Sequence, residues 1–425
     1  MMLNAAAPSG TVAVGSKANT FCINSVDLEG GESSKVTVRW RDGRLSVFHS
    51  RWLLANCPSR WQSGTGQVME LGFPADATVA NAILTNGGKT LTLHWSFKHT
   101  SVFDSNYLRI YDYSMDAVMA RKRLVDPIAG LPVQSNQSIP RVNHDEVMKD
   151  DGALLRWTTA LEERGICIVE DVPTVSESIR AISGRICHPM VTLYGTTFDV
   201  KVEESAINIA YTTAELGFHM DLPYYESPPG IQMLHCLQFD SSIEGGESVF
   251  IDAFALADLL RKKDPVAFKT LCRIPATFKK NHLQRAVPAQ YFYQRPHISV
   301  NKDGDVIAVH WSPPFEGPLH CAAEDVEEYY RAYDLFKGLM KDEEILKEWL
   351  IEFRLKPGEM VSFNQRRLLH GRRGFDHSSN GVRHLQGIYL PADDWASKHR
   401  YLKARSGRAP IGVEHLKRTG NSSHI

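Results

Sequence analysis

Residues 216–223 read Leu-Gly-Phe-His-Met-Asp-Leu-Pro, and the most informative part is the tripeptide His219-Met220-Asp221. In an extended strand successive side chains point to opposite faces, so one intervening residue places His219 and Asp221 on the same face. An imidazole beside a carboxylate is two-thirds of the two-His, one-carboxylate triad that holds non-haem Fe(II) and leaves coordination positions open. The same residues are also compatible with a hydrogen-bonded core histidine and an aspartate that forms a turn before Pro223.

The third ligand of such a triad must be a histidine that arrives on another strand. His370, in Leu368-Leu369-His370-Gly371-Arg372, follows the strand-and-turn segment expected over residues 359–369. Arg383 comes thirteen residues later in a further expected strand, and a buried guanidinium can bind a carboxylate bidentately. We therefore predict that His219, Asp221 and His370 are the catalytic iron ligands. Arg383 is predicted to bind the distal carboxylate of 2-oxoglutarate.

Composition excludes several other classes of protein. The 425 residues carry 48 Lys+Arg against 49 Asp+Glu, a net charge of −1, which argues against a general nucleic-acid binder because counterion release needs an excess of cations. We find no stretch of ~18 uncharged apolar residues and no targeting peptide near the start. Seven scattered cysteines indicate buried thiols rather than a disulfide framework. We expect a cytoplasmic protein with no membrane or nucleic-acid partner.

The hydrophobic pattern predicts two domains and an α+β fold class. Residues up to about 35 are small and polar and are expected to be frayed, whereas residues 35–125 predict a small β-rich domain built from hairpins at 36–48 and 82–95. The proline-containing residues 126–141 suggest a linker at the start of a larger domain over 126–425. Its strands are expected at residues 166–169, 231–237, 247–251, 360–363 and 384–390, and its clearest helices at 145–164 and 325–350. Strands spread over this length suit a barrel or sandwich better than alternating βαβ units.

Longer stretches resemble a known family. Residues 208–223 read Asn-Ile-Ala-Tyr-Thr-Thr-Ala-Glu-Leu-Gly-Phe-His-Met-Asp-Leu-Pro, and further matching segments are residues 228–237, 245–248, 367–373 and 383–389. With these segments the chain resembles the γ-butyrobetaine dioxygenase family, whose sister enzymes are the trimethyllysine dioxygenases, from about residue 35 onwards. The resemblance implies a double-stranded β-helix (jelly-roll) catalytic core with an added N-terminal domain, assembled as a homodimer. It also implies Fe(II) with 2-oxoglutarate as cosubstrate and ascorbate as reductant.

The resemblance also assigns roles to residues. Leu234 and Ser248 match positions beside the 2-oxoglutarate pocket, although Ser248 is equally compatible with a hydroxyl that simply begins a strand. Asn208 matches the amide that holds the substrate carboxylate. Four residues match the aromatic cage for a trimethylammonium group: Tyr194, Phe198, Tyr211 and Tyr389. Such a cation has no N–H to donate and therefore needs aromatic faces, but ordinary core packing would also explain these side chains.

Three departures from the family pattern bear on function. Phe198 stands where the family has Trp, and residues 309–314 (Val-His-Trp-Ser-Pro-Pro) replace an Asn-rich segment that adds a second carboxylate contact. The family's N-terminal domain binds zinc through three Cys and one His, of which only Cys57 and His99 have counterparts here. Two ligands cannot satisfy a closed four-coordinate site, so we expect no structural zinc.

We therefore expect hydroxylation of a small quaternary ammonium acid, with γ-butyrobetaine to L-carnitine as the leading case. The alternative is an oxygenase of the same fold that hydroxylates, desaturates or epoxidises a different small molecule or specialised metabolite. A non-catalytic jelly-roll binder would be expected to have lost one of the two His, the Asp or the Arg. A nucleic-acid binder is favoured only by Arg366-Arg367 and Arg372-Arg373, which we interpret as salt-bridge partners.

Overall fold

The structure is a computed structural model that describes residues 21–28, 34–62, 64–70, 72–125, 134–135, 137–202, 209–284, 288–376 and 381–407. It divides into two compact units, one built on Met1–Pro127 and the other on Ile128–Arg408. Most of the linker expected between them, residues 126–133 and 136, lies outside the described residues. Among the described helices none is long and apolar enough to cross a membrane.

The first unit contains two antiparallel three-stranded sheets, in the orders β1-β2-β3 and β4-β5-β6. Alternation explains the sheet core, since Leu91, Leu93 and Trp95 of β5 are buried while the residues between them are partly exposed. The strands are β1 (Ile23–Leu28), β2 (Lys35–Trp40), β3 (Leu45–His49), β4 (Val79–Thr85), β5 (Thr90–Trp95) and β6 (Thr100–Asp104). The helices are α1 (Ser50–Ala55), η1 (Pro58–Arg60), η2 (Asn86–Gly88), α2 (Ser105–Ile110) and α3 (Met115–Val125).

Strand β1 corrects the expectation that the chain is frayed as far as residue 35. It pairs with β2 and buries Ile23, but only that one of its six residues is fully buried. A strand with a single buried residue leaves a weak alternation in the sequence, which explains why it was not anticipated.

Two antiparallel sheets of the second unit position the predicted site residues. One has the order β10-β19-β12-β17 and the other β7-β8-β18-β11-β20-β9, in which only the β7–β8 pair is parallel. Consecutive strands from β9 to β12, and again from β17 to β20, lie alternately in the two sheets. This alternation is consistent with the expected jelly-roll core. The strands are β7 (Arg141–Asn143), β8 (Ile166–Glu170), β9 (Thr197–Val200), β10 (Leu216–His219), β11 (Ile231–Phe239), β12 (Ser248–Asp252), β17 (Ile351–Phe353), β18 (Met360–Asn364), β19 (Leu368–Arg372) and β20 (Arg383–Leu390). All five strands predicted for this unit are present.

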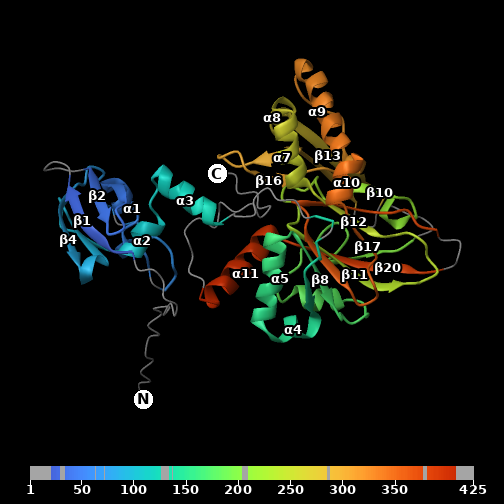
Figure 1. Cartoon of the computed structure of the whole chain (residues 1–425), viewed down its shortest axis with the longest axis horizontal. Helices are drawn as coiled ribbons and strands as arrows, with labels where there is room; N and C mark the ends of the chain where they lie inside the picture. The colour runs from blue at the N-terminus through green and yellow to red at the C-terminus, as the bar shows by residue number, and fades with distance from the viewer. Residues whose placement is uncertain are drawn as a thin grey trace. The chain divides into compact units, whose positions relative to one another are not determined.

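A core of apolar side chains from both sheets lies between them, including Phe250 of β12, Phe363 of β18 and Leu385 of β20. Helices cover the other face of the six-stranded sheet, and Figure 1 shows α5 and α11 side by side on that layer. Trp157 of α5 is fully buried there and donates a 2.8 Å hydrogen bond from Nε1 to Oγ of Ser362. The covering helices are α4 (His144–Lys149), α5 (Asp151–Glu163), α6 (Ser178–Ser183) and α11 (Ala392–Arg405).

A third group of elements packs around Trp311 and Phe336 on the remaining side of the unit. It consists of α7 (Ala253–Lys263), α8 (Pro265–Arg273), β13 (Pro275–His282), β14 (Ala289–Pro296), β15 (Ile298–Val300), β16 (Val306–Val309), η4 (Pro313–Phe315), η5 (Ala323–Asp325), α9 (Val326–Leu339) and α10 (Glu343–Trp349). The one remaining described helical turn is η3 (Ile209–Tyr211).

Both long helices expected from the sequence are in fact interrupted. The helix over residues 145–164 is split into α4 and α5 at Asp150, whose side chain accepts from Ala153 N and caps α5. The helix over 325–350 is likewise split into α9 and α10, where Asp342 accepts from Glu344 N and Ile345 N. An aspartate that caps backbone N–H groups favours a new helix start over continuation, and the apolar period alone does not reveal this.

Candidate metal centre and its pocket

Strand pairing brings His219 and His370 together. His219 ends β10, His370 lies within β19, and the two residues are opposite each other in the antiparallel register with ring centroids 4.2 Å apart. Asp221 follows two residues after His219, and Met220 between them is fully buried on the opposite side. Leu222 then has a φ of 57°, a conformation uncommon for a residue with a side chain, and it turns the chain away from the site.

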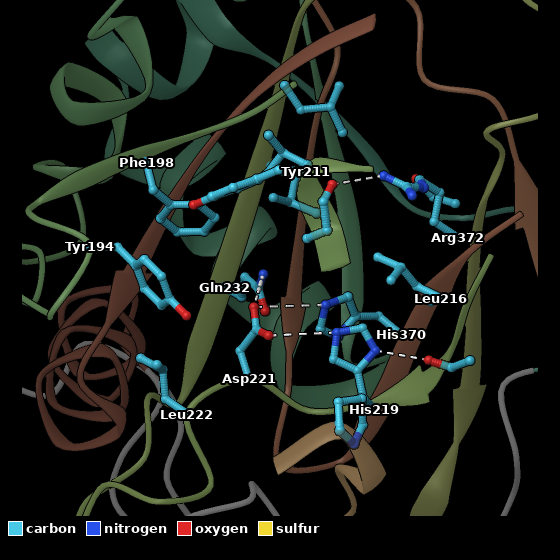
Figure 2. A pocket seen from close by; sticks show the side chains of 18 of the residues that line it. Tyr194, Phe198, Tyr211, Leu216, His219, Asp221, Leu222, Gln232, His370 and Arg372 are labelled. Carbon is cyan, nitrogen blue, oxygen red and sulfur yellow. Dashed lines mark hydrogen bonds and ion pairs between the residues drawn. The ribbon is translucent and has the colours of Figure 1, made fainter. Parts of the chain in front are cut away.

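The three side chains fit a divalent cation. His219 Nε2 lies 3.6 Å from Asp221 Oδ1, His370 Nε2 lies 3.9 Å from Asp221 Oδ2, and the three candidate ligand atoms are all within 4.8 Å of one another. Figure 2 shows both imidazoles and the carboxylate converging on one point. Two imidazole nitrogens and one carboxylate oxygen are the donor set of non-haem Fe(II) sites, so the residues present suit that ion.

Neighbouring side chains fix the orientation of these ligands. His219 Nδ1 bonds to the carbonyl of Gly217 at 2.8 Å, which requires Nδ1 to be the protonated nitrogen and leaves Nε2 to face Asp221. Asp221 Oδ2 accepts from Gln232 Nε2 at 2.8 Å and from the Tyr389 hydroxyl at 2.7 Å. Gln365 bonds to both the backbone N–H and the carbonyl of Asp221, at 3.1 and 3.2 Å.

Gln232 and Gln365 were not anticipated from the sequence. The only signal for Gln232 is its position as a polar residue inside the apolar strand Ile231-Gln232-Met233-Leu234. A buried amide of this kind must find partners within the protein.

Electrostatics favour the cation-binding forms of Asp221 and His370, whereas Asp221 draws His219 toward its protonated form. Burial lowers the pKa of His370 to about 3, so this imidazole is neutral near pH 7. Burial acts to raise the pKa of Asp221, but its hydrogen bonds and the two imidazoles outweigh this and leave the pKa lowered. Burial also acts to lower the pKa of His219, and the hydrogen bond to Asp221 reverses the direction. An ionised carboxylate next to a neutral imidazole is the state that a divalent metal requires.

Arg383 forms a basic end of the same pocket. It is only 5 % exposed at the start of β20, and its Nε donates to the carbonyl of Gly246 at 3.3 Å. Its guanidinium lies over the rings of Phe239 and Phe375, 5.2 and 5.7 Å from their centroids. Burial lowers the pKa of Arg383 to about 9, and within the described part of the chain no carboxylate lies at ion-pair distance. A buried cation without a protein anion is a natural partner for an anionic ligand.

Leu234 and Ser248 line this pocket, as Arg383 does. Arg372 also lines it and donates to the backbone carbonyls of Ala210, Thr212 and Ala214 at 3.0, 2.7 and 2.6 Å. These bonds hold the segment that leads from Tyr211 into β10.

Two of the four arginines around His370 form the salt bridges expected for them. Arg367 pairs with Asp252 at 2.8 Å, and Arg373 pairs with Glu352 at 2.7 Å. Arg366 and Arg372 instead bond to backbone carbonyls, since irregular loops beside them present carbonyl groups that need donors.

Aromatic rings form the other end of the pocket. Phe198 stacks on Tyr389 with centroids 4.9 Å apart and planes at 20°, and Tyr194 lies 6.1 Å from Phe198. Figure 2 shows Tyr194 and Phe198 on one side of the triad and Arg372 on the other. Tyr211 lines the same cavity, as do Tyr224 and Phe315, which the sequence did not identify. Asn208 lies outside the described residues.

A glycine makes room for the Phe198 ring. Phe198 pairs with Gly387 in the β9–β20 register, and a Cβ on Gly387 would lie 2.2 Å from Phe198 Cζ. Every second residue of β20 lies on the same face of the sheet. This face carries Arg383 at one end and Tyr389 at the other, with Leu385 and Gly387 between them.

The segment that departs from the family pattern also reaches the pocket. Pro314 and Phe315 line the cavity, whereas His310 and Trp311 are buried next to the α9 side of the unit. The wall contributed by this segment is therefore apolar.

In the N-terminal unit, Cys57 and His99 are close but are accompanied by hydroxyl groups. Cys57 Sγ lies 2.9 Å from Ser101 Oγ, 3.0 Å from Ser59 Oγ and 3.4 Å from His99 Nε2. The sulfur is fully buried within a hydrogen-bonded cluster.

An α+β unit with two histidines and an aspartate at one point, next to a buried arginine, defines the class of Fe(II)- and 2-oxoglutarate-dependent oxygenases. Residues 127–389 match the family described as taurine catabolism dioxygenase TauD, TfdA family, and residues 30–109 match the gamma-butyrobetaine hydroxylase-like N-terminal family. The chain therefore belongs to the TauD/TfdA family, in its γ-butyrobetaine dioxygenase branch, and is a 2-oxoglutarate-dependent dioxygenase that uses Fe(II).

Individual relatives agree with this placement. Gamma-butyrobetaine dioxygenase of Pseudomonas sp. (strain AK-1) is 32% identical over 86% of this chain and 93% of its own length. The human protein of the same name is 27% identical over 87% of this chain and 94% of its own. Dioxygenase str8 of Strobilurus tenacellus is 30% identical over 83% of this chain and 84% of its own.

Proposed function

We propose that this protein hydroxylates a small quaternary ammonium acid, with γ-butyrobetaine to L-carnitine as the leading case. The observation that carries the proposal is a single pocket with a buried guanidinium at one end and stacked aromatic rings at the other. The metal centre belongs to the same pocket. A molecule with a cationic head group and a reactive C–H bond a few carbons away suits this arrangement.

His219, Asp221 and His370 are proposed to hold Fe(II), and Arg383 the distal carboxylate of 2-oxoglutarate. When bound, Fe(II) and 2-oxoglutarate supply the O₂ chemistry that inserts an oxygen atom into an unactivated C–H bond. Arg383 orients the cosubstrate through two parallel hydrogen bonds, which a buried guanidinium makes readily. Leu234 and Ser248 form the wall against which the cosubstrate would lie, and the rigid sheet holds these groups in place.

The aromatic end is proposed to bind the trimethylammonium group. Each ring face within about 6 Å of a cation contributes roughly 0.5–2 kcal/mol, depending on how far the site is desolvated. Tyr194, Phe198 and Tyr389 adjoin one another, and Tyr211 lines the same cavity. Asn208 remains the proposed partner of the substrate carboxylate.

The test is substrate-dependent decarboxylation of 2-oxoglutarate. Full-length protein with Fe(II), ascorbate and 2-oxoglutarate is expected to form succinate faster when γ-butyrobetaine is added, and to yield L-carnitine. The neutral isostere 5,5-dimethylhexanoate, in which carbon replaces the ammonium nitrogen, is expected to bind at least tenfold more weakly. Equal binding of the two compounds would contradict the proposed cage.

A second candidate is an oxygenase that acts on a different metabolite. It is favoured by the apolar wall that Pro314 and Phe315 contribute, and dioxygenase str8 is as similar to this chain as several relatives named for γ-butyrobetaine. If γ-butyrobetaine gives no stimulation while 2-oxoglutarate still binds, this candidate is preferred.

We also propose that the two sheets form a double-stranded β-helix and that the protein acts as a homodimer. Sedimentation analysis of the purified full-length chain tests the second statement.

A further inference from the structure

A second cavity lies on the other side of β10. It encloses about 380 Å³, a volume within the range of small-molecule sites, and Figure 1 shows α10 and β10 close to each other in this region. Its lining residues come from β10, from the segment that follows β16, and from the α9–α10 region. No part of the proposed reaction uses this cavity.

Strand β10 separates the two cavities. Leu216 and Gly217 contribute to the walls of both, Phe218 lines only the second, and His219 lines only the first. This division follows from the alternation of side chains along a strand. The second cavity is therefore a separate space, one strand away from the metal centre.

The walls of the second cavity are mainly apolar. Apart from β10, apolar side chains come from β12, from the segment after β16 and from α9, α10 and the residues next to them. They are Val249, Trp311, Pro313, Met340, Leu346 and Leu350. Binding of an apolar group that displaces water from such a cavity is favourable.

The charged residues of this cavity leave a positive excess. Arg373 forms ion pairs with Glu352 at 2.7 Å and Glu215 at 3.4 Å, so these three groups together carry one negative charge. Lys337 and Lys341 are exposed at the cavity, and within the described residues neither has a carboxylate at ion-pair distance. Lys337 lies over the Tyr333 ring, 5.8 Å from its centroid, and interacts with Glu316 through charge. Its ammonium and that of Lys341, beside an apolar wall, are complementary to a ligand with an apolar body and an anionic head.

We propose that this cavity is a binding site for an amphipathic monocarboxylate, with an alkyl chain against Phe218, Met340 and Leu346 and the carboxylate at Lys337 and Lys341. The inference does not depend on which compound the enzyme hydroxylates. Lysine ammonium groups act as flexible point charges, which suits a carboxylate whose position is set mainly by the packing of its chain.

The test is calorimetric titration of octanoate into full-length protein saturated with Mn(II) and 2-oxoglutarate, so that the metal and cosubstrate sites are already occupied. We expect saturable binding of one octanoate per chain. Octan-1-ol shares the chain but lacks the negative charge, and it is expected to bind at least tenfold more weakly.

Variants locate the site. The double variant Lys337→Gln/Lys341→Gln is expected to weaken octanoate binding at least tenfold, whereas Lys347→Gln, an exposed lysine of α10 that does not line the cavity, is expected to bind like the wild type. Leu346→Trp, which fills the apolar part, is expected to abolish binding while 2-oxoglutarate still binds. Absence of saturable binding, equal binding by the double variant, or equal binding of octan-1-ol would each overturn the proposal.

Discussion

The hydroxyl of Tyr389 donates a 2.7 Å hydrogen bond to Oδ2 of Asp221. Gln232, which lies directly opposite Tyr389 in the β11–β20 register, donates to the same oxygen at 2.8 Å. Two donors on Oδ2 leave Oδ1, which faces His219, as the oxygen best placed to bind a cation. Tyr389 therefore joins the two ends of the pocket, because its ring stacks on Phe198 while its hydroxyl orients a metal ligand.

Removing the Tyr389 hydroxyl should weaken metal binding but leave the stacking of the Tyr389 ring on Phe198 in place. We expect Tyr389→Phe to weaken Mn(II) binding about tenfold, the lower end of the range seen when groups that orient metal ligands are removed. Calorimetric titration of the metal-free protein measures this. Unchanged Mn(II) affinity would show that Gln232 alone is sufficient to orient the carboxylate.

Arg383 should determine the affinity for the cosubstrate. With Mn(II) present, 2-oxoglutarate is expected to raise the melting temperature of the wild type, because the dicarboxylate relieves the cost of a buried cation that lacks a protein anion. Arg383→Leu should lose this increase, measured by thermal unfolding, and retain its Mn(II) affinity. A variant that is still stabilised by 2-oxoglutarate would place the cosubstrate elsewhere.

Gly387 should control the aromatic end alone. The Cβ of Gly387→Ala would lie 2.2 Å from Phe198 Cζ, so the ring must move off the strand and into the pocket. We expect kcat/KM for the ammonium substrate to fall at least tenfold, while stabilisation by 2-oxoglutarate persists. Gly338→Ala in α9 is the matched control, since its Cβ meets nothing within 4 Å and activity should be unchanged.

Stability should fall as the pH is lowered. Burial lowers the pKa of His297 to about 4 and that of His235 to about 4, so the folded protein holds both imidazoles neutral. Between about pH 6.5 and pH 4 the unfolded chain takes up protons that the folded chain does not, and each group then costs about 1.4 kcal/mol per pH unit. Above pH 6.5 these two imidazoles are neutral in both states and do not lower the free energy of unfolding. Below pH 6.5 the free energy of unfolding falls as the pH is lowered.

Urea unfolding at a series of pH values measures this slope. His297→Gln should lower overall stability and also flatten the dependence between pH 6.5 and pH 4, because one of the imidazoles that titrate there only in the unfolded chain is gone. An unchanged slope in that variant would exclude His297 as a contributor.

The N-terminal unit should contain no stoichiometric zinc. Ser101 and Ser59 surround the Cys57 sulfur with hydroxyl groups, which are poor zinc ligands beside a single Cys and a single His. Elemental analysis of the purified protein is expected to find iron but less than a tenth of an equivalent of zinc. One zinc per chain that disappears in Cys57→Ser would show that the prediction is wrong.

The sequence was most informative where local rules determine position. Alternation in a strand placed His219 and Asp221 on one face, and the expectation that a second strand delivers His370 agrees with the register of β10 and β19. The strand assignments followed from short apolar runs, and Arg383 was identified as a guanidinium near an expected strand, thirteen residues after His370, that could bind a carboxylate. Resemblance to the family then extended these local patterns to the aromatic residues.

Contacts between distant segments could not be derived in the same way. Gln365 reaches the backbone of Asp221 from 144 residues away, and nothing in its own neighbourhood distinguishes it from a surface amide. Phe315 and Tyr224 line the pocket only because of how the α7–α10 layer packs. The helix breaks at Asp150 and Asp342 depended on capping bonds that compete with the apolar period.

Strand β20 carries Arg383 at one end and Tyr389 at the other on the same face, and its backbone is paired on both sides by β11 and β9. The spacing between the proposed cosubstrate anchor and the proposed head-group cage is thereby set by a paired strand, in which a slip by one residue would reverse every side chain. Adaptation to a longer or shorter compound must therefore occur in the irregular wall around Pro314 and Phe315. Substitutions in this wall can change the substrate without altering the candidate iron ligands.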